Sequence, residues 1–537
     1  MTRSEVATPE SVRAAFEHPG EMPASLTPEV ANRLANLVVA KPDAAKTTTR
    51  APYTLDALAS FRVSTPDDVE DAFARARRAQ QDWKNTSFKQ RKKILLRFHD
   101  LVLERQNEVL DIMQAESGKT RRDAFMEVMD AAIVSRYYAR TAESVLSPKR
   151  RRGLIPGMTA TTELRHPKGV VAVISPWNYP LSMAATDTIA ALMAGNAVVQ
   201  KPDTQTALTA LWALELMREA GLPRDVWQIV IGRGSSIGDS LMNNADYMMF
   251  TGSTASGREI ASAASRRLIG ASLELGGKNP MVVLDDADLD RAVEGAVAAS
   301  FPSAGQLCVS VERMYVHEDI YDEFVPRFVK RVGEMRLGAS YKFDMDMGSL
   351  TNASQLETVS SHVEDAVAKG AKVLAGGNPR PDLGPLFFEP TILEDVTPDM
   401  TLYRSETFGP VVSIYPFSAD DTAVRLANDT EYGLNASVWT SNGARGRAIA
   451  SRIHAGTVNV NEAYAAAWGS VDSPMGGMGD SGLGRRHGSE GILKYTEGQT
   501  IAYQRLHNIN PPKSIPWQAW AKATTVALKM FKRAGVK

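Results

Sequence analysis

Short apolar runs rich in β-branched residues alternate with helical stretches between residues 169 and 284. Helical patterns such as TIAALMAG and ALTALWALELMREAG lie between most of these runs. Strands that alternate with helices are typical of parallel βαβ units. The pattern therefore predicts an α/β protein with a doubly wound parallel sheet. The strand candidates are GVVAVIS (169–175), NAVVQK (196–201), VWQIVIG (226–232), DYMMFTG (246–252), SLELGG (272–277) and PMVVL (280–284).

A second alternating region extends from about residue 285 to 475, with RMYVHE, AKVLAGG, VVSIYPF, SVWTS and GTVNVNE as strand candidates. A chain of 537 residues is expected to form two or three packed units. The composition of residues 1–60 predicts an extended arm with one short helix near Pro28–Ala40. From Ser64 onward the apolar residues recur at helical spacing. The basic segment PKRRRG at 148–153 predicts a solvated turn.

Charge and cysteine content narrow the class of protein. The chain holds 61 Lys and Arg against 62 Asp and Glu, so no overall positive field favours nucleic acid. Its single cysteine excludes an internal disulfide, argues against a zinc-finger-like site and fits a reducing compartment. We find neither an apolar signal core at the start nor a run of about 18 uncharged apolar residues. A cytoplasmic protein without a transmembrane segment and without a metal site is predicted.

The last segment, residues 505–537, contains Lys and Arg but no Asp or Glu. Its stretch WQAWAKATTVALKMFKR predicts an amphipathic basic helix with Trp517, Trp520 and Phe531 on the apolar side. Such a helix can lie on a membrane surface. Packing on the protein's own surface or on a partner subunit is the favoured alternative.

FTGSTASG (250–257) is a candidate phosphate site, because it follows an apolar strand and opens a helix. Gly252 and Ser253 would present free N–H groups to an anion at the positive helix end. A plain turn with Ser253 as the helix cap explains the same residues. GRGSSIG (232–238) is one residue too long for the dinucleotide fingerprint and is interpreted as a turn.

Asn178 lies in the rigid loop SPWNYP, directly after a buried strand, where α/β proteins place their ligands. Its amide can donate to an oxyanion, or it can tie down the loop backbone. Glu274 stands in the apolar strand LELGG. Burial there would raise its pKa toward that of a general base, whereas a partly exposed Glu at a strand end is the simpler interpretation.

Cys308, in SAGQLCVS, is the only cysteine. A free cysteine is usually a small buried hydrophobic residue. The presence of a possible base, a possible oxyanion donor and a possible phosphate turn in the same chain favours a nucleophile instead.

Taken together these segments resemble the aldehyde dehydrogenase superfamily over roughly residues 35–505. The motifs occur in family order and are PWN (176–178), KP (201–202), FTGST (250–254), LELGGKNP (273–280), GQLC (305–308), ETFGP (406–410) and PMGGMGDSGLGR (474–485). The resemblance implies a Rossmann-like cofactor domain, an α/β catalytic domain and a small β element that joins subunits into a homodimer or homotetramer. The implied ranges are an N-terminal arm at 1–34, the cofactor-binding domain at 35–143 and 167–276, the catalytic domain at 277–478, the β-bridging element at 144–166 and 490–508, and the basic tail at 509–537.

The resemblance also implies roles for the three reactive side chains. Cys308 is expected to attack the aldehyde and form a thiohemiacetal. Asn178 and the Cys308 N–H are expected to hold the oxyanion. Glu274 is expected to activate the water that hydrolyses the resulting thioester to a carboxylic acid.

Further residues are implied to bind the cofactor. Lys201 and Glu406 correspond to residues at the two riboses, and Ser253 and Gly252 to those facing the pyrophosphate. NAD-preferring members often carry Glu three residues after the lysine of KP, and here Thr204 stands there. NADP is therefore expected, with NAD possible because Asp203 is adjacent. The remaining implied cofactor residues are Trp177, Leu275, Phe408 and Pro202.

Within the family the chain is most similar to the second type of NADP-dependent succinate-semialdehyde dehydrogenase, so succinic semialdehyde is the expected substrate. The better understood succinate-semialdehyde enzymes hold the substrate carboxylate with two arginines. Thr186 and Pro302 stand at those positions, and Asp187 replaces a lysine common beside the first. Ser303 replaces the usual Asn before AGQ, and Ser310 replaces a second cysteine.

Trp468 suggests a wall of the substrate tunnel, which would equally suit an aliphatic or aromatic aldehyde. A broad-specificity aldehyde dehydrogenase is therefore the alternative function. A catalytically retired structural or binding member is a remote one, because Cys308, Glu274 and Asn178 are all present.

Overall fold

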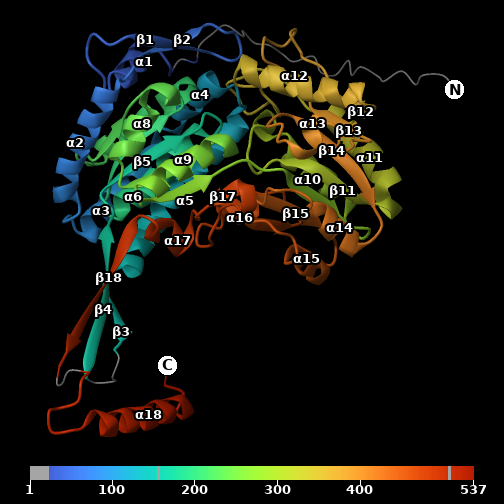
Figure 1. Cartoon of the computed structure of the whole chain (residues 1–537). Coiled ribbons are helices and arrows are strands. Elements are labelled where there is room, and N and C mark those ends of the chain that lie inside the picture. The colour runs from blue at the N-terminus through green and yellow to red at the C-terminus, as the bar shows by residue number, and fades with distance from the viewer. Residues whose placement is uncertain (1–22, 24, 154–157, 506–508, 537) are drawn as a thin grey trace.

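The computed structural model describes residues 23, 25–153, 158–505 and 509–536, arranged around three main sheets (Figure 1). Two sheets form the body, each with helices packed against it, and the third is an arm that extends away from the body. The predicted α/β class is confirmed. A fourth, two-stranded antiparallel sheet pairs β1 (Lys46–Arg50) with β2 (Ala57–Arg62).

The first body sheet has six strands in the order β17-β9-β8-β5-β6-β7. All neighbours are parallel except β17, which runs antiparallel to β9. Its strands are β5 (Val170–Ser175), β6 (Ala197–Pro202), β7 (Trp227–Ile229), β8 (Tyr247–Thr251), β9 (Gly270–Glu274) and β17 (Gly482–Leu483). Its crossover helices are α6 (Pro180–Met193), α7 (Ala207–Glu219), α8 (Gly234–Asn244) and α9 (Thr254–Arg266). The interpretation of GRGSSIG (232–238) as a turn is wrong from Gly234 onward, because these residues begin the helix α8.

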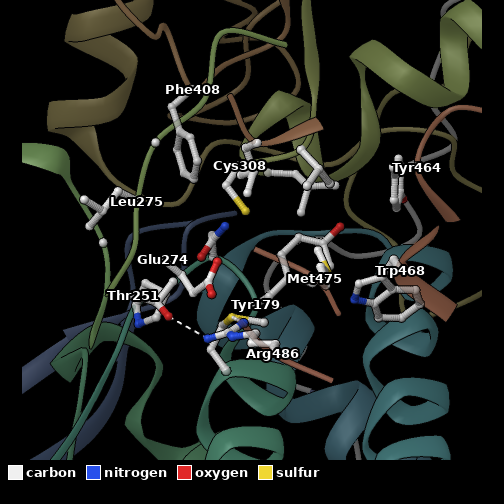
Figure 2. Close-up of a pocket in the computed structure, with 18 of the residues that line it drawn as sticks. Tyr179, Thr251, Glu274, Leu275, Cys308, Phe408, Tyr464, Trp468, Met475 and Arg486 are labelled. Carbon is white, nitrogen blue, oxygen red and sulfur yellow. Dashed lines mark hydrogen bonds between the residues drawn. The ribbon is translucent and has the colours of Figure 1, made fainter. Parts of the chain in front are cut away.

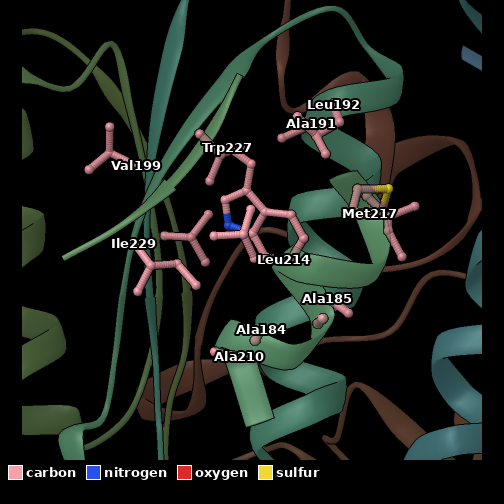
Figure 3. Packing of buried hydrophobic residues seen from close by; sticks show 14 of the residues in the cluster. Ala184, Ala185, Ala191, Leu192, Val199, Ala210, Leu214, Met217, Trp227 and Ile229 are labelled. Atoms are coloured by element: carbon pink, nitrogen blue, oxygen red, sulfur yellow. The ribbon is translucent and has the colours of Figure 1, made fainter. Parts of the chain in front are cut away.

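This sheet is buried on both faces, which explains why its strands read as continuous apolar runs. Trp227 of β7 is fully buried and packs close to Leu214 and Met217 of α7 (Figure 3). Its indole N–H donates to Gln200 Oε1 of β6 at 3.0 Å, so the one polar atom of the ring has a partner.

Five helices at the N-terminal side complete this half of the body. Thr65 caps α2 (Pro66–Trp83): its hydroxyl accepts from the Asp68 N–H, and Asp68 accepts from the Thr65 N–H in return. These helices are α1 (Pro28–Ala35), α2 (Pro66–Trp83), α3 (Phe88–Glu104), α4 (Gln106–Ser117) and α5 (Arg121–Leu146). Most of the predicted N-terminal arm, residues 1–22 and 24, lies outside the described residues.

The second body sheet has seven strands in the order β12-β13-β14-β11-β10-β15-β16, parallel except at β12. The strands are β10 (Asn279–Val283), β11 (Val311–His317), β12 (Lys372–Ala375), β13 (Thr391–Glu394), β14 (Val411–Phe417), β15 (Asn435–Trp439) and β16 (Thr457–Val460). The helices of this half are α10 (Leu289–Ser300), α11 (Glu318–Gly333), α12 (Ala353–Ala368), α13 (Thr401–Arg404), α14 (Asp420–Ala427), α15 (Gly443–Ala450) and α16 (Ala465–Gly469). The helix α17 (Gly488–Leu493) packs instead against α5 and α6 of the first half. The five strand candidates of the second alternating region all fall in this sheet.

The arm is a three-stranded antiparallel sheet of β3 (Lys149–Arg152), β4 (Thr159–Pro167) and β18 (Thr496–Gln504). The turn predicted for PKRRRG is wrong, because Lys149–Arg152 pairs with Ala160–Glu163 of β4. All four residues are exposed, so the segment lacks the apolar alternation by which a strand is recognised.

The basic tail forms the predicted helix, α18 (Trp517–Arg533), near the end of the arm (Figure 1). None of its residues is buried, and Trp517 is 64% exposed. Packing on the protein's own surface is therefore not observed, while contact with a membrane surface or a partner subunit stays a prediction. Within the described residues no helix is both long and apolar enough to cross a membrane.

The strands of the three sheets fall within the ranges expected for the three units, except that β4 extends by one residue, Pro167, beyond its range and that β17 has no range. β17 lies in residues 479–489, which the predicted ranges leave unassigned, and it joins the edge of the first body sheet. The domain boundaries themselves stay a prediction.

Candidate active site

A cavity of about 290 Å³ opens between the two body sheets (Figure 2). The last residues of β8 and β9, Thr251 and Glu274, contribute to its wall, together with the loop that follows β5. The second half of the body contributes Cys308, which precedes β11. The cavity thus lies at the carboxyl ends of parallel strands, where α/β proteins bind their ligands.

Cys308 lies on a loop that follows three consecutive residues in the left-handed region. Ser303, Ala304 and Gly305 have φ of 50°, 57° and 70°. Asn adopts this conformation more readily than other non-glycine residues, which gives a physical reason for the family's usual Asn at position 303. Here Ser303 is held by its N–H, which donates to Asp123 Oδ2 at 3.0 Å, and by its hydroxyl, which donates to the Tyr179 oxygen at 3.2 Å.

Gly305 is the residue of this loop that tolerates no side chain. A Cβ atom there would lie 2.0 Å from the carbonyl oxygen of Gly409, in the loop that carries Glu406 and Phe408. We expect Gly305→Ala to lower the free energy of unfolding by more than about 1 kcal/mol and to reduce turnover, because strain and a backbone clash act together.

Gly234→Ala is the matched control, since nothing lies within 4 Å of a Cβ at this position in α8. Thermal unfolding and turnover of both variants check the prediction. Equal behaviour of the two variants would contradict the close packing of the cysteine loop against the 406–410 segment.

The thiol of Cys308 points toward the carboxylate of Glu274 (Figure 2). Burial, and secondarily the neighbouring Glu406 carboxylate, raise the pKa of the Cys308 thiol to about 12. The side chain is therefore a protonated thiol in this state of the protein at neutral pH. It becomes a nucleophile only when the proton leaves during the reaction.

Asn178 is buried, and its side-chain Nδ2 donates to the carbonyl oxygen of Gln306 at 2.9 Å. Of the two roles predicted for Asn178, its amide does hold a backbone in place. The backbone that it holds is that of the cysteine loop, whereas the prediction was its own loop. A side-chain amide has two N–H groups, so one is left for a ligand oxygen. The main chain of Asn178 is fixed by Lys119 Nζ, which donates to its carbonyl oxygen at 2.6 Å and pairs with Glu127 at 2.5 Å.

Glu274 is buried at 6% exposure, so the partly exposed alternative is wrong. Desolvation raises the pKa of its carboxyl to about 7, against the opposing effect of Arg486 and Lys494. Its Oε1 atom has no hydrogen-bond partner among the described residues. A carboxylate of that pKa with a free oxygen in a cavity is suited to general-base catalysis near neutral pH.

One side of the cavity is lined by two aromatic rings, an apolar side chain and the start of a helix. Trp177 and Phe408 meet edge to face at 5.5 Å between ring centroids, and Leu275 lies on the same side (Figure 2). Ser253 caps α9, accepting from the Ser256 N–H, so the predicted capping role is real and leaves the remaining N–H groups of the first turn available. Glu406 is held by the Gly277 N–H at 2.9 Å.

The predicted ribose-binding segment begins at the end of β6 and lies outside the cavity lining. Burial lowers the pKa of Lys201, whose Nζ makes one hydrogen bond, to the Pro202 carbonyl at 3.4 Å. A desolvated ammonium with so weak a partner fits an anionic or polyol ligand. Asp203 accepts from the Gln205 N–H at 2.9 Å and caps the turn that begins at Thr204. One oxygen of the Asp203 carboxylate is thus held in the turn.

The opposite side of the cavity is mainly aromatic and apolar. Thr186 and Trp468, both predicted, line it, whereas Pro302 does not. The sequence interpretation missed several lining residues: Met126, Asp130, Tyr179, Met183, Leu307, Val309, Tyr464, Met475, Arg486 and His487. Of these, Arg486 is the one that stays cationic, because burial first and Arg486 second lower the pKa of His487 to about 4.

A thiol and a carboxyl group of raised pKa share one cavity at the carboxyl ends of the parallel strands, an arrangement typical of an enzyme active site. The chain belongs to the aldehyde dehydrogenase family, whose model matches residues 39–501. It is 52% identical over 497 residues to a Mycobacterium tuberculosis protein named "Putative succinate-semialdehyde dehydrogenase NADP(+) 2", covering 92% of this chain and 96% of that one. The resemblance stated from the motifs is confirmed.

Solved structures agree with this assignment. The betaine aldehyde dehydrogenase of Staphylococcus aureus in complex with NAD+ has a TM-score of 0.85 at 30% identity, covering 90% of this chain and 98% of that chain. A structure titled as an NADP-dependent enzyme of E. coli has a TM-score of 0.82 at 32% identity, covering 86% and 95%.

Proposed function

We propose that this protein oxidises an aldehyde to a carboxylic acid with NADP as the preferred cofactor, using Cys308 as nucleophile and Glu274 as general base. The observation that supports this most strongly is the approach of the Cys308 thiol and the buried Glu274 carboxylate across one cavity (Figure 2). The side-chain amide of Asn178 is hydrogen-bonded to the cysteine loop, which supports its proposed role as an oxyanion donor in the same cavity.

In the proposed reaction the thiol gives its proton to a solvent water molecule as sulfur attacks the aldehyde carbon. A C–S bond forms, and the carbonyl oxygen becomes an oxyanion held by the free N–H of Asn178 and by the Cys308 N–H. When bound, the nicotinamide supplies the acceptor for the hydride that leaves this carbon. Glu274 then takes a proton from water as the water attacks the thioester, the C–S bond breaks and the acid is released.

Cofactor preference is proposed on two grounds. The mycobacterial relative is named for NADP, and Thr204 stands where NAD-preferring members often carry a carboxylate that would repel a 2′-phosphate. The pocket residues Trp177, Phe408, Leu275, Ser253, Gly252 and Glu406 would hold the rest of the cofactor, and Lys201 with Pro202 its ribose.

Thr204→Glu is expected to lower the ratio of kcat/KM for NADP over NAD by at least about tenfold, or about 1.4 kcal/mol, because the new carboxylate repels the phosphate. Steady-state kinetics with both cofactors measure this. Thr204→Gln is the control, since it has the same size without the charge and should leave the ratio near that of the unmodified protein. An unchanged ratio in Thr204→Glu would mean that the 2′-position is recognised elsewhere.

Succinic semialdehyde is proposed as substrate on the strength of the relatives' names. The aromatic wall of Tyr179, Tyr464 and Trp468 favours a second candidate, a broader aliphatic or aromatic aldehyde. A comparison of kcat/KM for succinic semialdehyde, hexanal and benzaldehyde decides between them. A preference for hexanal or benzaldehyde would overturn the first candidate and leave the second.

Subunit assembly through the arm is proposed as well, because β18 exposes Ile501 and Tyr503 at 50% and 65%. A homodimer or homotetramer in the cytoplasm is the proposed form, and light scattering of the whole chain measures its mass. A monomer at micromolar concentration would contradict this role of the arm.

A further inference from the structure

Arg486 lies beside the general base that the proposed function assigns. Its main chain pairs with Met475, and its guanidinium is buried against the cavity. Nη2 donates to Asp187 Oδ2 at 2.5 Å and to Thr251 Oγ1 at 2.7 Å. Thr251 is the register partner of Glu274 on the adjacent strand, and Figure 2 shows the guanidinium next to the Glu274 carboxylate.

Asp187 is shared by a second cation. Lys494 Nζ donates to Asp187 Oδ1 at 3.4 Å, and the Tyr495 hydroxyl donates to the same oxygen at 3.3 Å. Two buried basic side chains therefore face one carboxylate, and burial lowers the pKa of Lys494 against the effect of Asp187. Because an unbalanced buried charge is costly, a second negative group is required nearby. Glu274 is at hand, buried, with Oε1 lacking a hydrogen-bond partner among the described residues.

Most of the other titratable groups around Glu274 do not supply this balance. Glu127 is already paired with Lys119, and His487 is neutral. Burial raises the pKa of Asp130 to about 7, as it does that of Glu274, so Asp130 can share the negative charge with Glu274. Arg485 adds a more distant positive charge, and the hydroxyl of Tyr247 and the thiol of Cys308 are protonated at neutral pH because burial raises the pKa of each.

We propose that Asp187, Arg486 and Lys494 form a buried charge cluster that holds Glu274 ready as the base for thioester hydrolysis, with Arg486 favouring the carboxylate form and Asp187 opposing it. The inference rests on the proposed function, since it assumes that Glu274 is the base. Arg486 is a positioning residue in this account. Its guanidinium donates hydrogen bonds to Asp187 and Thr251, on the Glu274 side of the cavity. These contacts do not favour a role for Arg486 as the anchor of a substrate carboxylate.

The cluster predicts pH shifts of opposite sign from two variants. In Arg486→Gln the Glu274 carboxylate loses a neighbouring cation, so its pKa rises. The acidic limb of the pH–rate profile for thioester hydrolysis, where the rate rises with pH, then moves up by roughly one pH unit. In Asp187→Asn a neighbouring negative charge is lost, so the pKa falls and the limb moves down. Arg486→Lys keeps the charge and should return the limb close to that of the unmodified protein, even where the rate itself is lower.

Single-turnover release of the carboxylic acid, measured from about pH 5 to 9 after the reduced cofactor has formed, reports this limb directly. Opposite shifts in Arg486→Gln and Asp187→Asn, with rescue by Arg486→Lys, support the cluster. Shifts in the same direction, or none, overturn it, since a merely structural role would not change sign with charge.

Two controls separate the possible failures. Should Arg486→Gln not fold, as judged by circular dichroism, Asp187→Asn and Arg486→Lys still decide between the outcomes. If Glu274→Gln leaves acid release unchanged, the base assignment in the proposed function fails. If Glu274→Gln slows acid release but the charge variants leave the limb in place, only the cluster fails.

Discussion

Cys308→Ala is expected to abolish hydride transfer while leaving cofactor binding intact. No other cysteine exists in the chain, so no second thiol can replace the C–S bond on which the proposed reaction depends. Loss of a nucleophile of this kind costs on the order of 10⁴-fold or more in turnover. The ring-binding cleft of Trp177, Leu275 and Phe408 is built by other loops and is untouched by the change.

Reduced-cofactor absorbance measures the first part of this prediction, and calorimetric titration with NADP measures the second. Cys308→Ser is the matched control, because it keeps the shape of the site but replaces sulfur by a weaker nucleophile at neutral pH. Turnover near that of the unmodified protein in Cys308→Ala would refute the assignment of the nucleophile. Loss of NADP binding together with activity would show that the variant is disrupted and not merely inert.

Glu274→Gln is expected to convert steady turnover into a burst followed by a slow phase. The amide keeps the shape of the side chain but cannot take a proton from water, so the thioester accumulates on Cys308. General-base assistance contributes about 10²- to 10⁴-fold, and the slow phase should fall by an amount in that range. The burst itself should approach one reduced cofactor per active site.

The pH dependence of the slow phase gives this prediction a second readout. In the unmodified protein a carboxyl with pKa raised to about 7 acts as base only when ionised, so hydrolysis should rise as pH increases through that value. In Glu274→Gln this limb should disappear. Unchanged steady turnover, or an unchanged limb, would show that another group is the base.

Much of the fold is predictable because the parallel strands are buried on both faces. Runs such as VVAVIS of β5 and NPMVV of β10 are apolar for that reason, and their spacing by helices fixes the α/β class. The exposed strand Lys149–Arg152 carries no such pattern. Its pairing with β4 follows from contacts along the arm and not from its own residues, so a turn was the natural interpretation.

The candidate site is likewise predictable from the sequence only in part. Cys308, Asn178 and Glu274 each stand in a motif whose local chemistry is recognisable, and the structure brings them to one cavity. The buried state of Glu274 could not be predicted, because β17 and the loop that follows it arrive from residues far along the chain. Arg486 was missed for the same reason: its partner Asp187 is 299 residues away in sequence.

Asp187 did leave a signal in the sequence, as an acidic residue where the family commonly has lysine. Only the structure supplies its meaning, since the carboxylate there meets Arg486 and Lys494 beneath the proposed base. A residue that reverses the usual charge at a buried position implies a partner of the opposite sign. The sequence alone can suggest that such a partner exists, but it cannot identify it.

The central claim is that aldehyde oxidation proceeds through a thioester on Cys308. Intact-mass measurement of the Glu274→Gln protein, taken after mixing with NADP and an aldehyde and followed by peptide mapping, tests it most directly. The account predicts a mass increase equal to the acyl group of that aldehyde, located on the peptide that contains Cys308 and dependent on NADP. Formation of reduced cofactor without any adduct, or an adduct on another residue, would contradict it.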